Sequence, residues 1–248
     1  MTVQLVRMAN PSTPWPSGDD GAESNFRSVI TTTPVRNETQ TVRMDKLNER
    51  VRLGNIDLMM IGDSITQDWE LPDNRSTWQH YYGHRNAVNF GVGSDRTQHL
   101  LWRLHNGNLD GISPKLAVLM IGTNNATHDV PTEIAEGIQA ILKILRTRLP
   151  AMKVLVLGIF PRGESDSDPF RRVNTETNEI IGKWTRRVRD SQLEYLDIGD
   201  AFLEDGGILS SEMAPGLLHL SPAAHRVWAA AIEPSVARMF GDSPVEPQ

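Results

Sequence analysis

Five short apolar runs recur along the chain, and each ends at or near a glycine or a proline. Such continuous runs are typical of strands buried on both faces of a parallel sheet, because a half-exposed strand would alternate apolar and polar positions. We therefore predict five strands, at residues 56–62, 87–92, 116–122, 153–160 and 193–199.

Amphipathic stretches lie between these runs. In residues 134–149 the apolar positions follow spacings of three and four, and residues 173–188 repeat that pattern. Both stretches predict helices with one buried face. We also predict a helix at 42–53 that ends at Gly54, and a last helix that Pro234 kinks or restarts.

Strands that alternate with helices predict a three-layer α/β domain around a five-stranded parallel sheet. The start of the chain differs, since it is rich in Pro, Ser, Thr, Asn and Gly and shows no sustained period. We therefore expect a loosely ordered N-terminal extension at residues 1–40 and one domain at residues 41–242.

Charge and composition narrow the classes of partner. The chain of 248 residues has a formal net charge of −6 and no block of Lys or Arg, which argues against nucleic acid or an anionic membrane surface as its main partner. The absence of cysteine excludes disulfides, thiolate zinc sites and a cysteine nucleophile. No signal-like or membrane-spanning apolar run is visible, so we expect a cytoplasmic protein without membrane insertion.

Polar turns follow the predicted strands, where the functional groups of an open parallel sheet gather. Asp63 and Ser64 follow the first strand, Gly93-Ser94-Asp95 the second, and Asn124 the third. Each turn alone is ordinary. A late histidine, His219, stands just before a predicted helix start at Ser221-Pro222.

Together these groups form a set suited to acyl transfer, because a serine needs a base and a tetrahedral oxyanion needs N–H donors. Ser64 would be the nucleophile, with His219 as its base. The oxyanion would be held by the N–H of Ser64, a backbone N–H of the Gly93–Ser94 turn and the side chain of Asn124. Asp63 is better suited to cap a helix than to act as an acid.

Several other groups have supporting or ordinary interpretations. Asp63, Asp95 and Arg162 are candidates for substrate contact or support, although a local ion pair with Glu164 is the simpler role for Arg162. The remaining histidines show no metal-ligand spacing with acids on one helical face, so we expect neither a catalytic metal nor another cofactor.

The sequence resembles the SGNH/GDSL-type hydrolases, with its strongest likeness to their platelet-activating-factor acetylhydrolase catalytic-subunit group. The stretches that carry the resemblance are IGDSITQDW (61–69), the segment 89–115, LMIGTNN (119–125), LGIFPRGE (157–164) and LHLSPAAHRVWA (218–229). The resemblance implies a flavodoxin-like sheet, metal-free ester hydrolysis and a homodimer. It also implies that Ser64 is the nucleophile, Asn124 the oxyanion asparagine and His219 the base.

Two positions depart from that family's pattern. Ser94 stands where a glycine usually lends its N–H to the oxyanion hole, which survives provided that the turn demands no positive φ there. Gly216 stands where an aspartate usually precedes the histidine by three residues. Three explanations stay open: another acceptor orients His219, the enzyme is a slow Ser–His dyad, or the chain binds without turnover. The acceptor would be a backbone carbonyl or an acid such as Glu212, Asp205 or Asp200.

We therefore expect a serine esterase that removes a short acyl group, foremost acetyl, from a small-molecule or glycan ester. The alternative is an inactive or weakly active binding protein on the same scaffold, which Gly216 favours.

Overall fold

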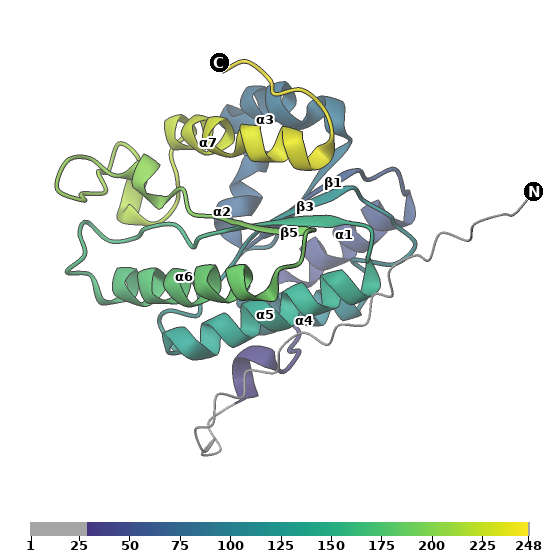
Figure 1. The fold of residues 1–248 in the computed structure, drawn as a ribbon, viewed down its shortest axis with the longest axis horizontal. Coiled ribbons are helices and arrows are strands. Elements are labelled where there is room, and N and C mark those ends of the chain that lie inside the picture. The colour runs from purple at the N-terminus through teal and green to yellow at the C-terminus, as the bar shows by residue number, and fades with distance from the viewer. Residues whose placement is uncertain (1–28, 248) are drawn as a thin grey trace, which may run out of the picture.

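A computed structural model describes residues 29–247 and contains one five-stranded sheet (Figure 1). All neighbouring strands are parallel and their order is β2-β1-β3-β4-β5, the flavodoxin-like arrangement. The five predicted strands and the fold class are confirmed. The strands are β1 (Leu58–Gly62), β2 (Ala87–Gly91), β3 (Leu116–Met120), β4 (Lys153–Leu157) and β5 (Leu193–Leu196).

Helices cover both faces of the sheet, which gives the three expected layers (Figure 1). One face packs against α1 (Thr41–Arg52), α4 (Thr97–His105), α5 (Pro131–Arg148) and α6 (Pro169–Val188). The other face packs against α2 (Ser64–Gln67), α3 (Arg75–Tyr82) and α7 (Pro222–Phe240). Short 3-10 helices are η1 (Val29–Thr32), η2 (Glu38–Gln40), η3 (Asp68–Glu70), η4 (Pro72–Asn74), η5 (Gly83–Arg85), η6 (Gly199–Phe202) and η7 (Pro215–Leu217).

The two central strands explain the continuous apolar runs. Every residue of β1 and β3 is buried, and successive side chains of each strand enter opposite cores. Met59 and Ile61 belong to the core under α1, α4, α5 and α6, whereas Leu58 and Met60 belong to the core under α3 and α7. Because both faces are covered, no position of these strands can be polar without cost.

The last helix begins as its sequence indicates. The Ser221 hydroxyl accepts from the Ala224 N–H at 3.2 Å, and Pro222 occupies the first turn. Pro234 lies within one uninterrupted helix rather than at a restart, and Gly241 ends it in the left-handed region, at φ 93°.

A buried ion-pair network ties α7 to η5. The guanidinium of Arg85 is fully buried and donates to both carboxylate oxygens of Glu233, at 2.7 Å each. It also donates to Asp242, at 2.8 and 2.9 Å. These bonds fix the end of the chain against the segment before β2.

Residues 29–40, which the sequence assigned to the extension, contact the domain. Asn37 is buried and donates to the Asp95 carboxylate at 2.9 Å, and the Thr31 carbonyl accepts from the Thr97 hydroxyl at 3.0 Å. The rest of the expected extension, residues 1–28, lies outside the described residues. Among residues 29–247, no helix is both long and apolar enough to cross a membrane.

Candidate active site

Ser64 lies at the carboxyl end of β1, as the first residue of α2. Asp63 caps this short helix, since its carboxylate accepts from the Ile65 N–H at 3.0 Å. Gly62 is required before the turn, because a Cβ at this position would clash with the Thr66 side chain and the Met120 carbonyl. The serine side chain is half-buried and therefore open to a ligand.

His219 meets Ser64 although 155 residues separate them in the chain. Its Nε2 lies 2.9 Å from the Ser64 Oγ, which is the geometry of a serine beside a general base. The histidine is held by its neighbours: Leu220 is buried, and the Ser221 N–H donates to the Met213 carbonyl at 2.8 Å. His219 itself is exposed, so the pair lies at the surface.

The turn after β2 offers one free N–H donor rather than two. The Gly93 N–H donates to the side-chain oxygen of Gln67 at 2.7 Å, so it is occupied. Within residues 29–247 no group accepts from the Ser94 N–H. Ser94 has φ 61°, so the turn does demand the left-handed conformation that favours glycine. Because Ser94 adopts this conformation and keeps an N–H that is unpaired among the described residues, the expectation that a positive φ here would remove the donor is wrong.

Asn124 lies in the loop after β3 and is half-buried. Its Nδ2 donates to the Asp95 carbonyl at 3.0 Å, which fixes the amide beside the loop that follows β2. Because an amide nitrogen carries two hydrogens, the second remains available to an oxyanion.

Asp95 is buried behind the site and supports it through hydrogen bonds rather than through contact with a ligand. Its fully buried carboxylate accepts from Arg103 Nε at 2.7 Å and from Asn37 at 2.9 Å. Arg103 also donates to the carbonyl of Gly62, at 3.1 Å. The ion pair thus joins the loop after β2 to the strand that ends at Ser64. Sequence reasoning missed Asn37 and Gln67, because side-chain bonds to distant loops leave no periodic signal.

Arg162 follows β4 and has a different partner from the expected Glu164. Its Nη1 donates to the Thr123 carbonyl at 3.0 Å, and its Cζ lies 5.1 Å from the ring centroid of Phe170. Burial lowers the pKa of this guanidinium. Arg162 therefore braces the loop that carries Asn124.

The residue in the usual place of the acid does not face a partner. Gly216 adopts φ 71° within η7, and a Cβ built there would meet no atom within 4 Å. Within residues 29–247 no hydrogen bond reaches Nδ1 of His219, and none links it to Glu212, Asp205 or Asp200. The same residues contain no group of three or more His, Cys, Asp or Glu that could hold a metal ion.

Comparisons with known proteins identify the family of the chain. Residues 60–227 match the model of the GDSL-like lipase/acylhydrolase family. The chain is 34% identical over 192 residues to platelet-activating factor acetylhydrolase IB subunit alpha2 of Rattus norvegicus, covering 77% of this chain and 81% of that protein.

Solved structures share the fold at low identity. A mutant of Axe2, an acetyl-xylooligosaccharide esterase from a Geobacillus species, superposes with a TM-score of 0.59 at 18% identity, covering 79% of this chain and 98% of that one. Est24, a carbohydrate acetylesterase from Sinorhizobium meliloti, gives 0.58 at 20% identity, covering 75% and 100%. The chain belongs to the GDSL-like lipase/acylhydrolase family.

Proposed function

We propose that this protein is a serine esterase that hydrolyses short acyl esters, with acetyl esters as its preferred substrates. The observation that carries the proposal is the 2.9 Å contact between Ser64 Oγ and His219 Nε2. Preference for acetyl is supported by the rat relative, whose name is that of an acetylhydrolase. Because His219 is exposed and Ser64 is half-buried, a small-molecule or glycan ester can reach the pair.

In this mechanism Ser64 Oγ attacks the acyl carbonyl carbon while its proton passes to His219 Nε2. The negative charge that develops on the carbonyl oxygen is held by the N–H groups of Ser64 and Ser94 and by the Asn124 amide. The Gly93 N–H is left out of this oxyanion hole, because Gln67 occupies it.

Collapse of the tetrahedral intermediate breaks the ester bond, and the imidazolium of His219 gives its proton to the leaving alcohol. A water molecule then attacks the acyl-serine, with His219 again as base, and releases the acid.

Hydrolysis of p-nitrophenyl acetate, butyrate and octanoate by the native protein and by Ser64→Ala tests the proposal. We expect turnover that falls with acyl length and drops by at least about 10³-fold in Ser64→Ala. Ser211→Ala, at an exposed serine, is the matched control. Ester binding without turnover that Ser64→Ala leaves unchanged would favour the binding protein instead.

The homodimer implied by the family resemblance remains a prediction of this proposal. Light scattering of the purified protein measures it directly, and a monomer mass across the accessible concentration range would remove it.

A further inference from the structure

His219 lacks the carboxylate that a serine–histidine pair normally uses. During attack its imidazole becomes a cation, and a nearby negative charge stabilises that cation. The loop that carries His219 has glycine at position 216, so the usual position of the acid does not supply this charge. One further acid lies close by in the fold, on the segment that follows the nucleophile.

Asp68 lies one helical turn after Ser64. Its backbone N–H donates to the Ser64 carbonyl at the end of α2. Residues four apart on a helix share one face, and each side chain leans toward the N-terminal turn. Asp68 therefore lies one turn from Ser64 on the same helix face, and the Ser64 hydroxyl contacts the imidazole of His219 at 2.9 Å.

The carboxylate of Asp68 is free to act on a neighbouring charge. It is half-buried, and it accepts no hydrogen bond from the side chains or backbone of residues 29–247. Burial raises the pKa of Asp68, and the charge of His219 opposes this rise. The charge of Asp68 also raises the pKa of Asp63.

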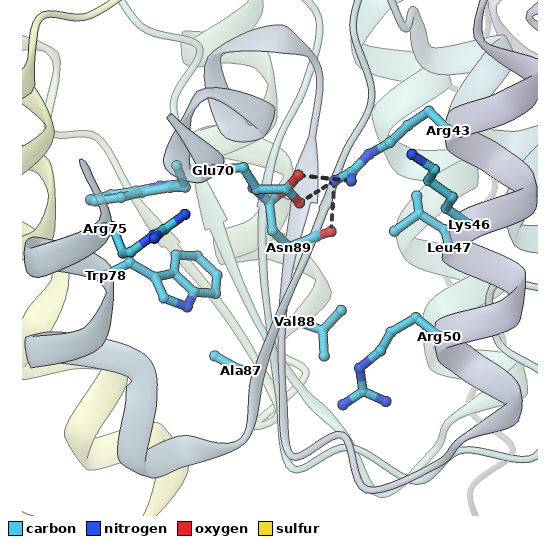
Figure 2. Close-up of a pocket in the computed structure, with 11 residues that line it drawn as sticks. Arg43, Lys46, Leu47, Arg50, Glu70, Arg75, Trp78, Ala87, Val88 and Asn89 are labelled. Atoms are coloured by element: carbon cyan, nitrogen blue, oxygen red, sulfur yellow. Dashed lines mark hydrogen bonds and ion pairs between the residues drawn. The ribbon is translucent and has the colours of Figure 1, made fainter. Parts of the chain in front are cut away.

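The segment that carries Asp68 is fixed on several sides. The Asp68 carbonyl accepts from the Leu71 N–H at 3.0 Å and from Asn74 Nδ2 at 2.7 Å. Trp69 is buried, and Arg43 of α1 holds Glu70 through two bonds of 2.9 and 2.6 Å. Figure 2 shows Arg43 reaching across a groove of about 510 Å³ to Glu70, with Asn89 beside them.

We infer that Asp68 is a positioning residue that supplies, from η3, the negative charge that Gly216 does not supply from the histidine loop. This inference rests on the proposed function for its role in catalysis. Asp68 takes up no proton in the reaction: the Ser64 proton moves to His219 Nε2 and on to the leaving group, while the Asp68 carboxylate stabilises the imidazolium.

Asp68→Asn, which keeps the shape of the side chain, tests the inference. We expect kcat to fall about tenfold at an unchanged KM, as the loss of one charge that acts on the imidazolium in a partly exposed site would produce. The acidic limb of the kcat/KM profile should move to lower pH, because His219 then loses a proton more easily. Asp73→Asn, at an exposed acid of η4, should match the native protein in both.

A titration of His219 by NMR gives a second reading that needs no turnover. Its signal is assigned with His219→Gln, and its pKa should be lower in Asp68→Asn than in the native protein. An unchanged pKa overturns the inference even if the esterase proposal stands. If the native protein shows no Ser64-dependent hydrolysis, the esterase proposal is wrong. The titration of His219 still decides whether Asp68 acts on its charge.

Gly216→Asp tests whether an acid at position 216 can take over the role of Asp68. If Asp68 fills the missing role, Gly216→Asp should raise kcat more in the Asp68→Asn background than in the native protein. Equal gains in both backgrounds would mean that the two acids act independently, which contradicts the inference.

Discussion

Asp63 is a carboxylic acid that the fold removes from water. It is fully buried, one of its oxygens accepts from the Ile65 N–H, and the other has no hydrogen-bond partner within the described residues. Burial, together with the charges of Asp95 and Asp68, raises its pKa to about 7. At neutral pH the residue beneath the nucleophile is thus partly protonated.

This raised pKa makes stability depend on pH in a definite direction. Between about pH 4 and pH 7 the folded protein keeps the Asp63 proton that the unfolded chain loses, so the free energy of unfolding falls as pH rises. For one group the slope is at most about 1.4 kcal/mol per pH unit. Urea unfolding at several pH values should show that Asp63→Asn removes this slope. If the free energies of unfolding of Asp63→Asn and the native protein differ by the same amount at every pH in that range, the prediction is wrong.

Ser94 carries a conformational cost that its position in the turn imposes. We expect Ser94→Gly to raise the free energy of unfolding by about 1 kcal/mol, because glycine adopts the left-handed region without a Cβ clash. Ser94→Ala keeps the Cβ and should give no gain. Chemical unfolding of the two variants measures the difference, and ester turnover should persist in Ser94→Gly since the N–H remains.

For single residues, the sequence predicts which catalytic side chains pair better than it predicts which backbone N–H groups stay unpaired. Ser64 and His219 were expected together because a serine that follows a strand needs a base, and a late histidine can supply one. Gly93 was expected in the oxyanion hole, but its N–H is taken by Gln67. Asp68 lies four residues after Ser64, and that spacing was the available signal.

Among the elements, the sequence predicts the buried strands and long helices well, because both depend on periodic burial. The run at 193–199 is shorter as a strand, and β5 is mostly half-buried, since it lies at the edge of the sheet. Pro234 is accommodated without a break, which its sequence alone does not indicate. The short 3-10 helices that carry Asp68 and Gly216 depend on local side-chain and backbone bonds and leave no period.

The ion-pair network between η5 and α7 gives a prediction about these elements. Among the described residues, Glu233→Ala leaves the buried Arg85 guanidinium with hydrogen bonds to Asp242 and the Tyr81 carbonyl, so we expect a loss of about 3–5 kcal/mol in the free energy of unfolding. Glu179→Ala breaks an exposed pair with Lys183 and should cost less than about 0.5 kcal/mol. Urea unfolding compares them; similar losses would mean that burial of the pair has no energetic weight.

For the molecule as a whole, the two cores share one sheet. Side chains from the same strands enter both, so disruption of β1 or β3 removes residues from both cores at once. We expect a single unfolding transition in which far-UV circular dichroism and tryptophan fluorescence have the same midpoint. Trp69 and Trp228 report one core and Trp184 the other, so separated midpoints would show that the cores unfold independently.

The position of Arg43 also bears on how the molecule avoids unwanted association. Among the strands of residues 29–247, β2 is an outer strand, with β1 as its neighbour in the sheet. Arg43 donates to the carbonyls of Gly91 and Asn89, at 3.1 Å each. A strand from another molecule that tried to extend the sheet would need those same carbonyls. Arg43 therefore opposes edge-to-edge aggregation. An added strand would have to displace its guanidinium from these carbonyls or bury its charge.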